Sequence, residues 1–524
     1  MKHFLLCTLI VLAGNAAFAQ FRNIQVDAAG NPNEPHIAID PRNPAHMVAG
    51  ANMDNVYQSF DGGFTWNKKR LTSTYGVWGD PIIMTDTAGS FYFFHLSNTS
   101  FSPIPQSTGW IDRMVCQRMD AFSGMWSNGG YAGLDQPKHQ DKPSVAYDSE
   151  HDRIYLAWTQ FDHYGSADPN DSSLILLSTS SDRGVSWSGP VRVNTKAGDC
   201  IDEDGTVEGA VPAIGLNYEL YLAWASKDGI VFKKSLDSGK TWPLTETRVD
   251  SIYGGWAYDI PGLSRCNGLP FMSTDLSNSA NRGNIYINWS DQRRGVNNTD
   301  VWLSRSTDGG NTWGTAVRVN DDTGTAQQFM SSMTVDQATG YIYVLFYDRR
   351  NAVLQNETDV YMAVSRDGGL TFSNEKVSET PFRPIASKFF GDYTSIAATN
   401  GIVRPVWARM DGGQTSIWTA IPDSALGVPG LTASGNRFDA VYPNPFTAYA
   451  QLPITLKATA PVSVNVIDVY GRTVAAIQSR FLPAGNHSIQ LRPAAYGLVP
   501  GTYFVEVRAG GERFVRKVVY AGAQ

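Results

Sequence analysis

Charged residues are scarce in this sequence. Asp, Glu, Lys and Arg make up 17% of its 524 residues, below the roughly 25% of an average soluble domain. Positive charge shows no surplus either, because the formal net charge is −7. Bulk charge therefore excludes a role in binding nucleic acid or an anionic membrane surface. Beyond the N-terminal segment, no apolar run approaches the roughly 18 residues of a membrane span, so we expect no transmembrane segment.

The N-terminal segment, residues 1–19, has the pattern of a cleaved signal peptide. A basic start precedes an apolar run from Phe4 to Gly14, and Ala17 and Ala19 provide the small residues before the cleavage site. The run is too short to cross a bilayer. We therefore expect an exported protein whose mature chain starts at Gln20.

Cysteine is also scarce, with four residues in the chain, of which Cys7 is lost with the signal peptide. Cys116, Cys200 and Cys266 remain, and an odd number in an exported protein favours one disulfide and one spare thiol. We predict that Cys200 pairs with Cys266, because the two lie in equivalent loops between repeats. Three unpaired cysteines are the alternative.

Glycine and aromatic residues are plentiful, and a repeat accounts for many of them. Five segments share the pattern Ser-x-Asp-x-Gly-x-Thr/Ser-Trp/Phe: Ser59–Trp66, Ser180–Trp187, Ser235–Trp242, Ser306–Trp313 and Ser365–Phe372. The pattern predicts a tight turn in which Asp accepts backbone N–H groups, Gly takes a positive φ, Thr or Ser closes the loop, and the aromatic ring packs beneath. The segments resemble the Asp-box, or bacterial neuraminidase repeat, which implies a β-propeller with these turns on the face away from the site.

Each turn belongs to a longer unit of four short strands. The first strand of the unit starts seven times, at Pro35, Pro81, Pro143, Pro212, Pro270, Ser331 and Thr394. The last unit lacks a fourth strand, and Arg22–Asp27 resembles the fourth strands of other units, so we expect the N-terminal strand to complete that sheet and close the ring. The predicted fold of residues 20–422 is all-β, a seven-bladed β-propeller, with six blades as the alternative.

A second domain is predicted at residues 437–524, after a linker at 423–436. Its alternating strands suit a small β-sandwich. The segments Tyr442–Phe446, Val469–Arg472, Gly501–Tyr503 and Lys517–Val519 resemble the C-terminal sorting domain of the type IX secretion system in Bacteroidota. That resemblance implies handling by the type IX machinery, release or display at the cell surface, and removal of the domain. An immunoglobulin-like stabilising or carbohydrate-binding module is the alternative.

Four carboxylates stand just before first strands of different units: Glu34, Asp80, Asp141 and Asp392. First strands line the channel of a propeller, so we expect these groups to converge at its mouth. Converging carboxylates bind a hard cation such as Ca²⁺, or raise one another's pKa as acid–base chemistry requires. Alternatively, each caps its own loop. No cofactor is required by this interpretation, and Ca²⁺ is the one candidate.

Arginine follows aspartate in two consecutive units, in the segments that start at Asp291 and Asp348. Each Asp could pair with its neighbouring Arg. Unpaired, Arg293, Arg349 and Arg409 could bind a substrate carboxylate. Trp256 and Tyr258 are expected on the face opposite the repeated turns, where they would suit stacking against sugar rings.

The resemblance to sialidases implies three Arg on the substrate carboxylate, a Tyr nucleophile activated by Glu, and an Asp acid. Tyr393 or Tyr258 could be the nucleophile and Glu208 its partner, and Asp141 and Asp392 are the candidate catalytic aspartates. The N-terminal Arg-Ile-Pro motif of that family is imitated only loosely by Phe21–Ile24, with no Pro.

These observations predict a propeller that binds or processes extracellular glycans or glycoproteins. The alternatives are an active exo-sialidase or another glycoside hydrolase, and a non-catalytic propeller that binds a protein.

Overall fold

The structure is a computed structural model that describes residues 21–522 except 103, 104, 106, 108, 121–123, 423–435, 439, 440, 442, 458, 469–471, 510 and 511. The predicted signal peptide, nearly all of the predicted linker, Tyr442 and most of the 469–472 motif lie outside these described residues. The chain divides between Leu426 and Gly427 into two compact units. No helix in the described part of the chain is long and apolar enough to cross a membrane.

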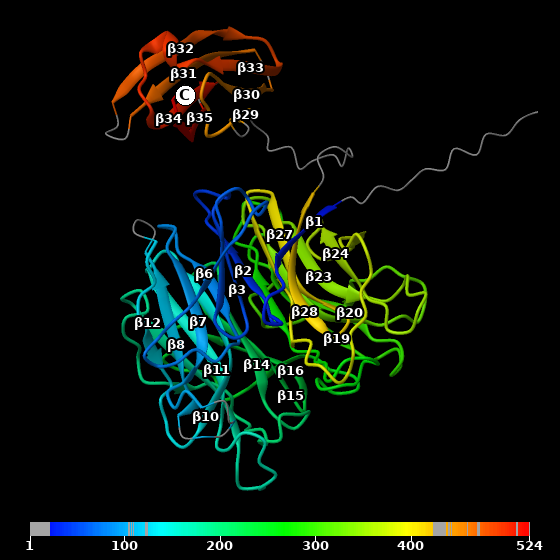
Figure 1. Cartoon of the computed structure of the whole chain (residues 1–524). Coiled ribbons are helices and arrows are strands. Elements are labelled where there is room, and N and C mark those ends of the chain that lie inside the picture. Colours follow the sequence, from blue (N-terminus) through cyan, green and yellow to red (C-terminus); the bar gives the residue numbers. More distant parts are fainter. Residues whose placement is uncertain are drawn as a thin grey trace, which may run out of the picture. The chain divides into compact units, whose positions relative to one another are not determined.

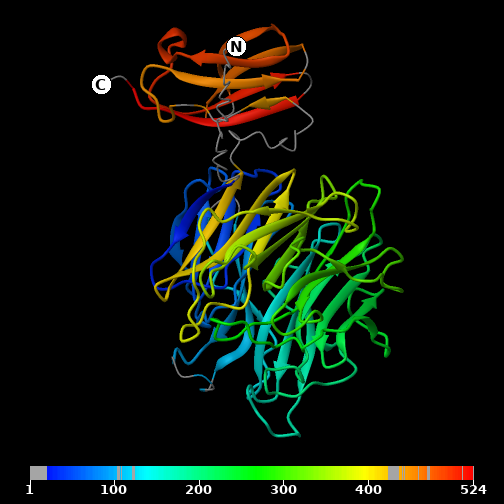
Figure 2. The same cartoon turned by 90° about the vertical axis from the view of Figure 1, so that its right-hand side faces the viewer.

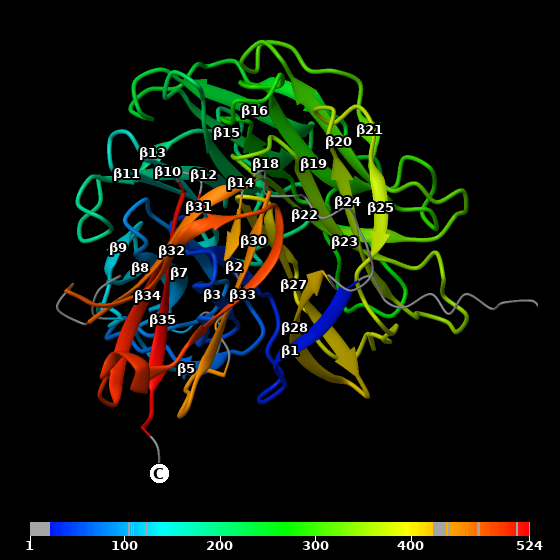
Figure 3. The same ribbon diagram turned by 90° about the horizontal axis from the view of Figure 1, so that it is seen from above.

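The first unit consists of four-stranded antiparallel sheets that follow one another around it (Figures 1 and 3). The first sheet contains β2 (His36–Ile39), β3 (Met47–Ala51), β4 (Asn55–Ser59) and β5 (Asn67–Arg70). The second contains β6 (Ile82–Thr85), β7 (Phe91–Asn98), β8 (Trp110–Met119) and β9 (Gly130–Ala132). The third contains β10 (His139–Asp148), β11 (Arg153–Phe161), β12 (Ser173–Ser180) and β13 (Val191–Arg192).

The next three sheets repeat this order. They contain β14 (Glu208–Ile214), β15 (Leu220–Ser226), β16 (Gly229–Ser235) and β17 (Thr247–Asp250), then β18 (Phe271–Thr274), β19 (Ile285–Asp291), β20 (Asp300–Ser306) and β21 (Val317–Arg318), then β22 (Gln328–Val335), β23 (Ile342–Asp348), β24 (Asp359–Ser365) and β25 (Ser373–Lys376). The described strands of the unit thus give six sheets in chain order and one more that joins the two ends.

That joining sheet combines the start and the end of the unit. It contains β26 (Ser395–Thr399), β27 (Ile402–Asp411) and β28 (Gln414–Pro422), with β1 (Phe21–Asp27) at its edge. β1 pairs with β28 from Phe21 opposite Pro422 onward, so the predicted closure by the N-terminal strand is confirmed. The innermost strands β2, β6, β10, β14, β18, β22 and β26 each contact the next, and β26 contacts β2. Figures 1 and 2 show the blue first sheet beside the yellow last one.

Burial explains why the sheets pack face to face. All residues of β3, β7, β19 and β23 are buried, so these inner strands read as nearly continuous apolar runs rather than alternating ones. In contrast, all four residues of the outer strand β5 are exposed. Inner strands therefore form the apolar layers between neighbouring sheets, and outer strands face solvent.

The five repeated turns have the predicted chemistry. In the first, Asp61 Oδ1 accepts the N–H of Thr65 at 2.9 Å, and Asp61 Oδ2 accepts the Thr65 hydroxyl at 2.6 Å. The Trp66 indole N–H donates to the carbonyl oxygen of Gly63 at 3.0 Å. Each turn joins the third strand of a sheet to the fourth. Because successive turns of an antiparallel meander alternate between its two ends, these turns lie opposite the second-to-third-strand turns and the connections between sheets.

The second unit has two antiparallel sheets whose buried side chains form one apolar core. One sheet contains β29 (Arg437–Phe438), β30 (Ala450–Leu456) and β33 (Gly485–Leu491), and the other contains β32 (Thr473–Leu482), β31 (Ala460–Ile467), β34 (Gly501–Ala509) and β35 (Glu512–Tyr520). A short 3₁₀ helix, η2 (Pro493–Tyr496), follows β33.

The turn geometry generates a stability prediction at Ser238. Each turn has two successive residues with positive φ, and in the third turn the first of these is Ser238, with φ 62°. Replacing it by glycine removes the strain of a left-handed side-chain residue, so Ser238→Gly should stabilise the first unit by about 0.5–1 kcal/mol. Chemical denaturation of the full chain would measure this.

The matched control is the next residue, Gly239→Ala. A Cβ there would lie 2.5 Å from the Leu177 side chain at φ 80°, so this variant should lose stability. Equal stability of Ser238→Gly and the wild type would contradict the interpretation of strain at this position.

Candidate functional site

In three successive sheets, a residue with positive φ followed by proline stands at the start of the first strand. Glu34, Asp80 and Lys142 each precede a proline, and their φ values are 52°, 50° and 51°. In β10 the pairing register shifts between Asp141 and Ser144, which marks a β-bulge at this point. A left-handed residue here redirects the chain as it enters the strand. The three side chains consequently gather at one end of the first unit.

Lys142 lies at the centre of the resulting cluster. Its Nζ donates to Asp392 Oδ2 at 2.7 Å and to Asp80 Oδ2 at 3.3 Å. The Arg265 guanidinium binds the same carboxylate, with Nε 2.8 Å from Asp392 Oδ1. Burial acts to raise the pKa of Asp392, but Lys142 and Arg265 outweigh it and hold that pKa well below its usual range. Asp392 is therefore a fixed anion.

The pKa values of Glu34 and Asp141 are shifted in the opposite direction, upward. Glu34 is 1% exposed and accepts hydrogen bonds from the Asn52 side chain and from the backbone N–H of Asp392. Burial, together with the charges of Asp80 and Asp392, raises the pKa of Glu34 well above its usual range. Burial also raises the pKa of Asp141, to about 7, despite the nearby Lys142.

Glu208 is the most isolated carboxyl group of the cluster. It is 0% exposed, and neither of its carboxyl oxygens has a hydrogen-bond donor within the described residues. Burial raises its pKa well above the usual range, and the neighbouring Asp202 and Asp141 raise it further. Burial and the two neighbouring carboxyl groups therefore favour the protonated form of Glu208.

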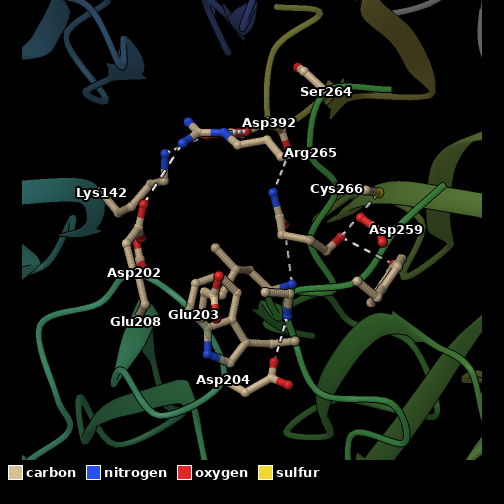
Figure 4. A pocket seen from close by; sticks show the side chains of 15 residues that line it. Lys142, Asp202, Glu203, Asp204, Glu208, Asp259, Ser264, Arg265, Cys266 and Asp392 are labelled. Atoms are coloured by element: carbon tan, nitrogen blue, oxygen red, sulfur yellow. Dashed lines mark hydrogen bonds and ion pairs between the residues drawn. The ribbon is translucent and has the colours of Figure 1, made fainter. Parts of the chain in front are cut away.

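Two cavities open beside this cluster. The first, which we call the acidic cavity, has a volume of about 470 Å³ and is lined by Asp202, Glu208, Trp256, Tyr258, Arg265 and Asp392, with Glu203, Asp204 and Asp259 at exposed positions (Figure 4). The second, which we call the amide–aromatic cavity, has a volume of about 380 Å³ and is lined by Asn33, Asn52, Asn55, Trp78, Trp110 and Tyr164, with Lys142 and Arg265. Lys142 and Arg265 line both.

The predicted convergence of Glu34, Asp80, Asp141 and Asp392 matches this arrangement, but their charges are met by Lys142 and Arg265. The ammonium group of Lys142 lies between Asp80 and Asp392, where a bound cation would have been expected. Among the described residues, no group of three or more His, Cys, Asp or Glu side chains is arranged to hold a metal ion. The residues present therefore do not fit the Ca²⁺ site considered from the sequence.

The predicted arginine triad is corrected by the structure. Arg293 binds Asp291 and stacks over Trp302, and Arg409 binds Asp411 at 2.6 Å. None of the three lines the acidic or the amide–aromatic cavity. For Arg293 and Arg409, the aspartate two residues away in the sequence satisfies the guanidinium charge locally.

Arg349 is held differently, by an aromatic ring and neutral oxygens rather than by a carboxylate. It stacks over Phe329 and donates to the carbonyl oxygen of Pro261 at 2.8 Å. The Asp348 carboxylate pairs instead with Arg350, at 2.8 Å.

The two candidate nucleophiles are not activated. Burial raises the pKa of both Tyr393 and Tyr258 well above the usual range, which disfavours the phenolate. Tyr258 is hydrogen-bonded to Ser290 at 2.6 Å. Trp256 lines the acidic cavity but is only 5% exposed, and its indole N–H points to the carbonyl oxygen of Thr206 at 3.3 Å. It therefore offers little surface for stacking.

The predicted disulfide is also corrected. Cys200 and Cys266 are both free and buried in the structure. Cys200 lies in the connection before β14, where it pairs with Ser166, whereas Cys266 lies in the connection before β18, beside Asn267. The two cysteines occupy equivalent positions in the repeat, but these positions precede different sheets, so the cysteines are not paired.

Sequence reasoning missed Lys142, Arg265 and Asp202. The signal for Lys142 was present, because Lys142-Pro143 occupies the place of Glu34-Pro35 and Asp80-Pro81. Arg265 had no such signal, since it lies in the long irregular connection between β17 and β18.

The ion cluster predicts a large effect of Asp392→Asn on folding. This change leaves the largely buried Lys142 and the half-exposed Arg265 without their shared buried anion, so we expect the first unit to lose about 3 kcal/mol of stability. Chemical denaturation of the full chain provides the measurement. Asp411→Asn, which removes the 57% exposed partner of Arg409, is the control and should cost less than about 1 kcal/mol. Similar losses in both variants would contradict the central role of Asp392.

The raised pKa of Asp141 predicts that the stability of the folded protein depends on pH. Its pKa is about 7 in the folded protein against an ordinary value of 3.8, so between these values the folded state keeps a proton that the unfolded state has released. Raising the pH through this window must therefore destabilise the wild type relative to Asp141→Asn, which cannot ionise. Denaturation midpoints of both proteins from pH 4 to pH 7.5 test this. A constant difference across the window would show that Asp141 is already ionised.

Residues 440–521 match the family model described as the secretion system C-terminal sorting domain. A comparison with curated protein sequences found no match. Solved structures similar to the chain include a protein described as of unknown function from Dyadobacter fermentans DSM 18053, with 10% identity, a TM-score of 0.42, and coverage of 77% of this chain and 99% of that one.

Two enzymes are also among these structures. The α-L-arabinanase of Penicillium chrysogenum has 10% identity and a TM-score of 0.40, over 76% of this chain and 97% of the enzyme. The NanB sialidase of Streptococcus pneumoniae has 9% identity and a TM-score of 0.44, over 73% and 84%. The predicted C-terminal sorting domain is confirmed, and it indicates export to the cell surface or secretion.

Proposed function

We propose that this exported protein binds extracellular glycans at the acidic cavity and hydrolyses their glycosidic bonds, with Glu208 as the proton donor. In this proposal the seven sheets of the first unit are the blades of one propeller, and the second unit is a small β-sandwich that directs export through the type IX system. The cavity lies at the end of the sheets opposite the five repeated turns.

The observation that carries the proposal is a pair of carboxyl groups with opposite environments in one cavity. Glu208 is buried with its pKa well above the usual range, while Lys142 and Arg265 keep Asp392 ionised. Both residues line the acidic cavity. Glycoside hydrolysis needs this combination, an acid that is still protonated near neutral pH beside a permanent negative charge.

The reaction can be written from these groups. Glu208 gives its proton to the glycosidic oxygen as the bond from that oxygen to the anomeric carbon breaks. The carboxylates of Asp202 and Asp392 stabilise the positive charge that develops on the sugar ring. A water molecule then forms the new bond to the anomeric carbon, and its released proton restores Glu208.

The cavity favours uncharged sugars over sialic acid. Recognition of a sialoside carboxylate needs available cations, but Arg293 and Arg409 are paired with aspartates, and Arg349 does not line the cavity. Lys142 and Arg265 are already paired with Asp392. An anionic substrate would therefore enter a cavity that has no unpaired positive charge among the described residues, and it would meet Glu203 and Asp259 at its edge.

The test is turnover of a panel of aryl glycosides by the full chain, covering neutral pyranosides, neutral furanosides and a sialoside. We expect hydrolysis of a neutral glycoside and a loss of about 10²–10⁴-fold in kcat for Glu208→Gln, as for removal of a general acid. Glu203→Gln, at an exposed position of the same cavity, is the matched control and should stay within a few-fold of the wild type.

Two other results would decide against this function. Hydrolysis of the sialoside alone, abolished by Arg293→Ala, would favour the exo-sialidase. No turnover of any glycoside, with binding on a glycan array, would favour a non-catalytic glycan-binding propeller.

A further inference from the structure

The amide–aromatic cavity differs in character from the acidic cavity beside it. Its wall combines three asparagines, Asn33, Asn52 and Asn55, with the aromatic rings of Trp78, Trp110 and Tyr164. Uncharged amides and flat apolar rings are the groups that recognise sugar hydroxyls and the C–H face of a sugar ring. The proposed hydrolysis makes no use of these residues.

The charges around this cavity cancel locally. Asp54 is paired with Arg70 at 2.6 Å, and Asp80 is paired with Lys142 at 3.3 Å. Burial raises the pKa of Glu34, which is hydrogen-bonded to Asn52. Lys142 and Arg265 also bind Asp392, so each lysine and arginine that lines this cavity already has a carboxylate partner.

Its aromatic rings are held in place by one another. Trp78 packs edge-on against Trp110, with ring centroids 6.5 Å apart, and Trp110 packs edge-on against Tyr164 at 5.7 Å. Trp78 is only partly buried, whereas Trp110 is 7% exposed. Trp78 thus offers part of a ring on a rigid support, so binding a sugar against it would cost little ordering entropy.

Three polar atoms of this wall have no hydrogen-bond partner within the described residues. They are Asn33 Oδ1, Asn55 Oδ1 and Trp110 Nε1, two acceptors and one donor. Buried polar groups are nearly always paired in folded proteins. These three atoms are themselves buried, so a ligand in the cavity would contact other atoms of its wall.

The two cavities meet at Lys142 and Arg265, which line both. We propose that the amide–aromatic cavity is a second saccharide subsite that takes an uncharged sugar ring, with Trp78 as its stacking surface. The substrate is then an oligosaccharide of at least two units that passes Arg265. This inference rests on the proposed function for the acidic cavity and adds the length and the neutral character of the substrate.

The experiment measures binding of neutral oligosaccharides to the full chain carrying Glu208→Gln, which prevents turnover. Calorimetric titration would use one- to four-unit ladders of xylose, mannose, glucose and arabinose oligomers. In at least one ladder we expect the Kd to fall by about tenfold or more from one unit to the longer oligomers. Adding Trp78→Ala should reverse this gain, and Trp78→Phe should recover most of it.

Two controls separate the subsite from the catalytic cavity. Phe60→Ala changes an exposed aromatic residue on a repeated turn and should leave the Kd unchanged. With Glu208 intact, Trp78→Ala should lower hydrolysis of the longer oligomers relative to hydrolysis of a single-unit aryl glycoside, and this ratio should fall in step with oligomer binding.

The outcomes distinguish this inference from the proposed function. Equal affinity for all lengths of every ladder, or affinity that Trp78→Ala does not change, overturns the second subsite even if aryl glycosides are hydrolysed. Length-dependent binding only of oligomers of glucosamine or of uronic acid, added as charged probes, also overturns it. Length-dependent binding of a neutral ladder that needs Trp78, without any hydrolysis, supports the subsite and removes the proposed hydrolase.

Discussion

The site depends on one ion pair, between the ammonium group of Lys142 and the carboxylate of Asp392. These residues come from the third and the last sheet of the ring, and their atoms lie 2.7 Å apart. Arg265, from the connection before β18, binds the same carboxylate. Without these two cations the acids at this end of the sheets would repel one another and would shift toward the neutral form. The pair therefore keeps Asp392 ionised, while burial raises the pKa values of Glu34, Asp141 and Glu208.

Much of the fold could be predicted because it follows from local rules. The Ser-x-Asp-x-Gly turns carry their hydrogen bonds within eight residues, and apolar runs such as Phe91–Leu96 mark strands buried on both faces. The resemblance of Arg22–Asp27 to a fourth strand was enough to predict the pairing of β1 with β28. The C-terminal unit carried motifs of its own, so its role in export was readable without any coordinates.

The site was predicted less well, because its side chains interact across sheets. Because Glu34, Asp80, Asp141 and Asp392 stand just before first strands, the sequence predicted that they lie close together. It could not show that Lys142 would neutralise two of them, since that contact joins residues 250 positions apart. The prediction that the arginines share one pocket was wrong for the opposite reason. Arg293 stands two residues after Asp291, and this short spacing satisfies the guanidinium before it can reach a shared pocket.

Charge also determines what the two cavities can accept. Among the described residues, Lys142 and Arg265 are the cations that line both cavities, and both are already paired with carboxylates of the protein. A ligand carboxylate would have to compete with Asp392 for them, at a buried position where breaking an ion pair is costly. Uncharged hydroxyl groups do not face that competition, because they need no cation for binding. The same pairing that keeps the acids at this end of the sheets thus disfavours an acidic ligand, and this is why the proposed substrate is a neutral sugar.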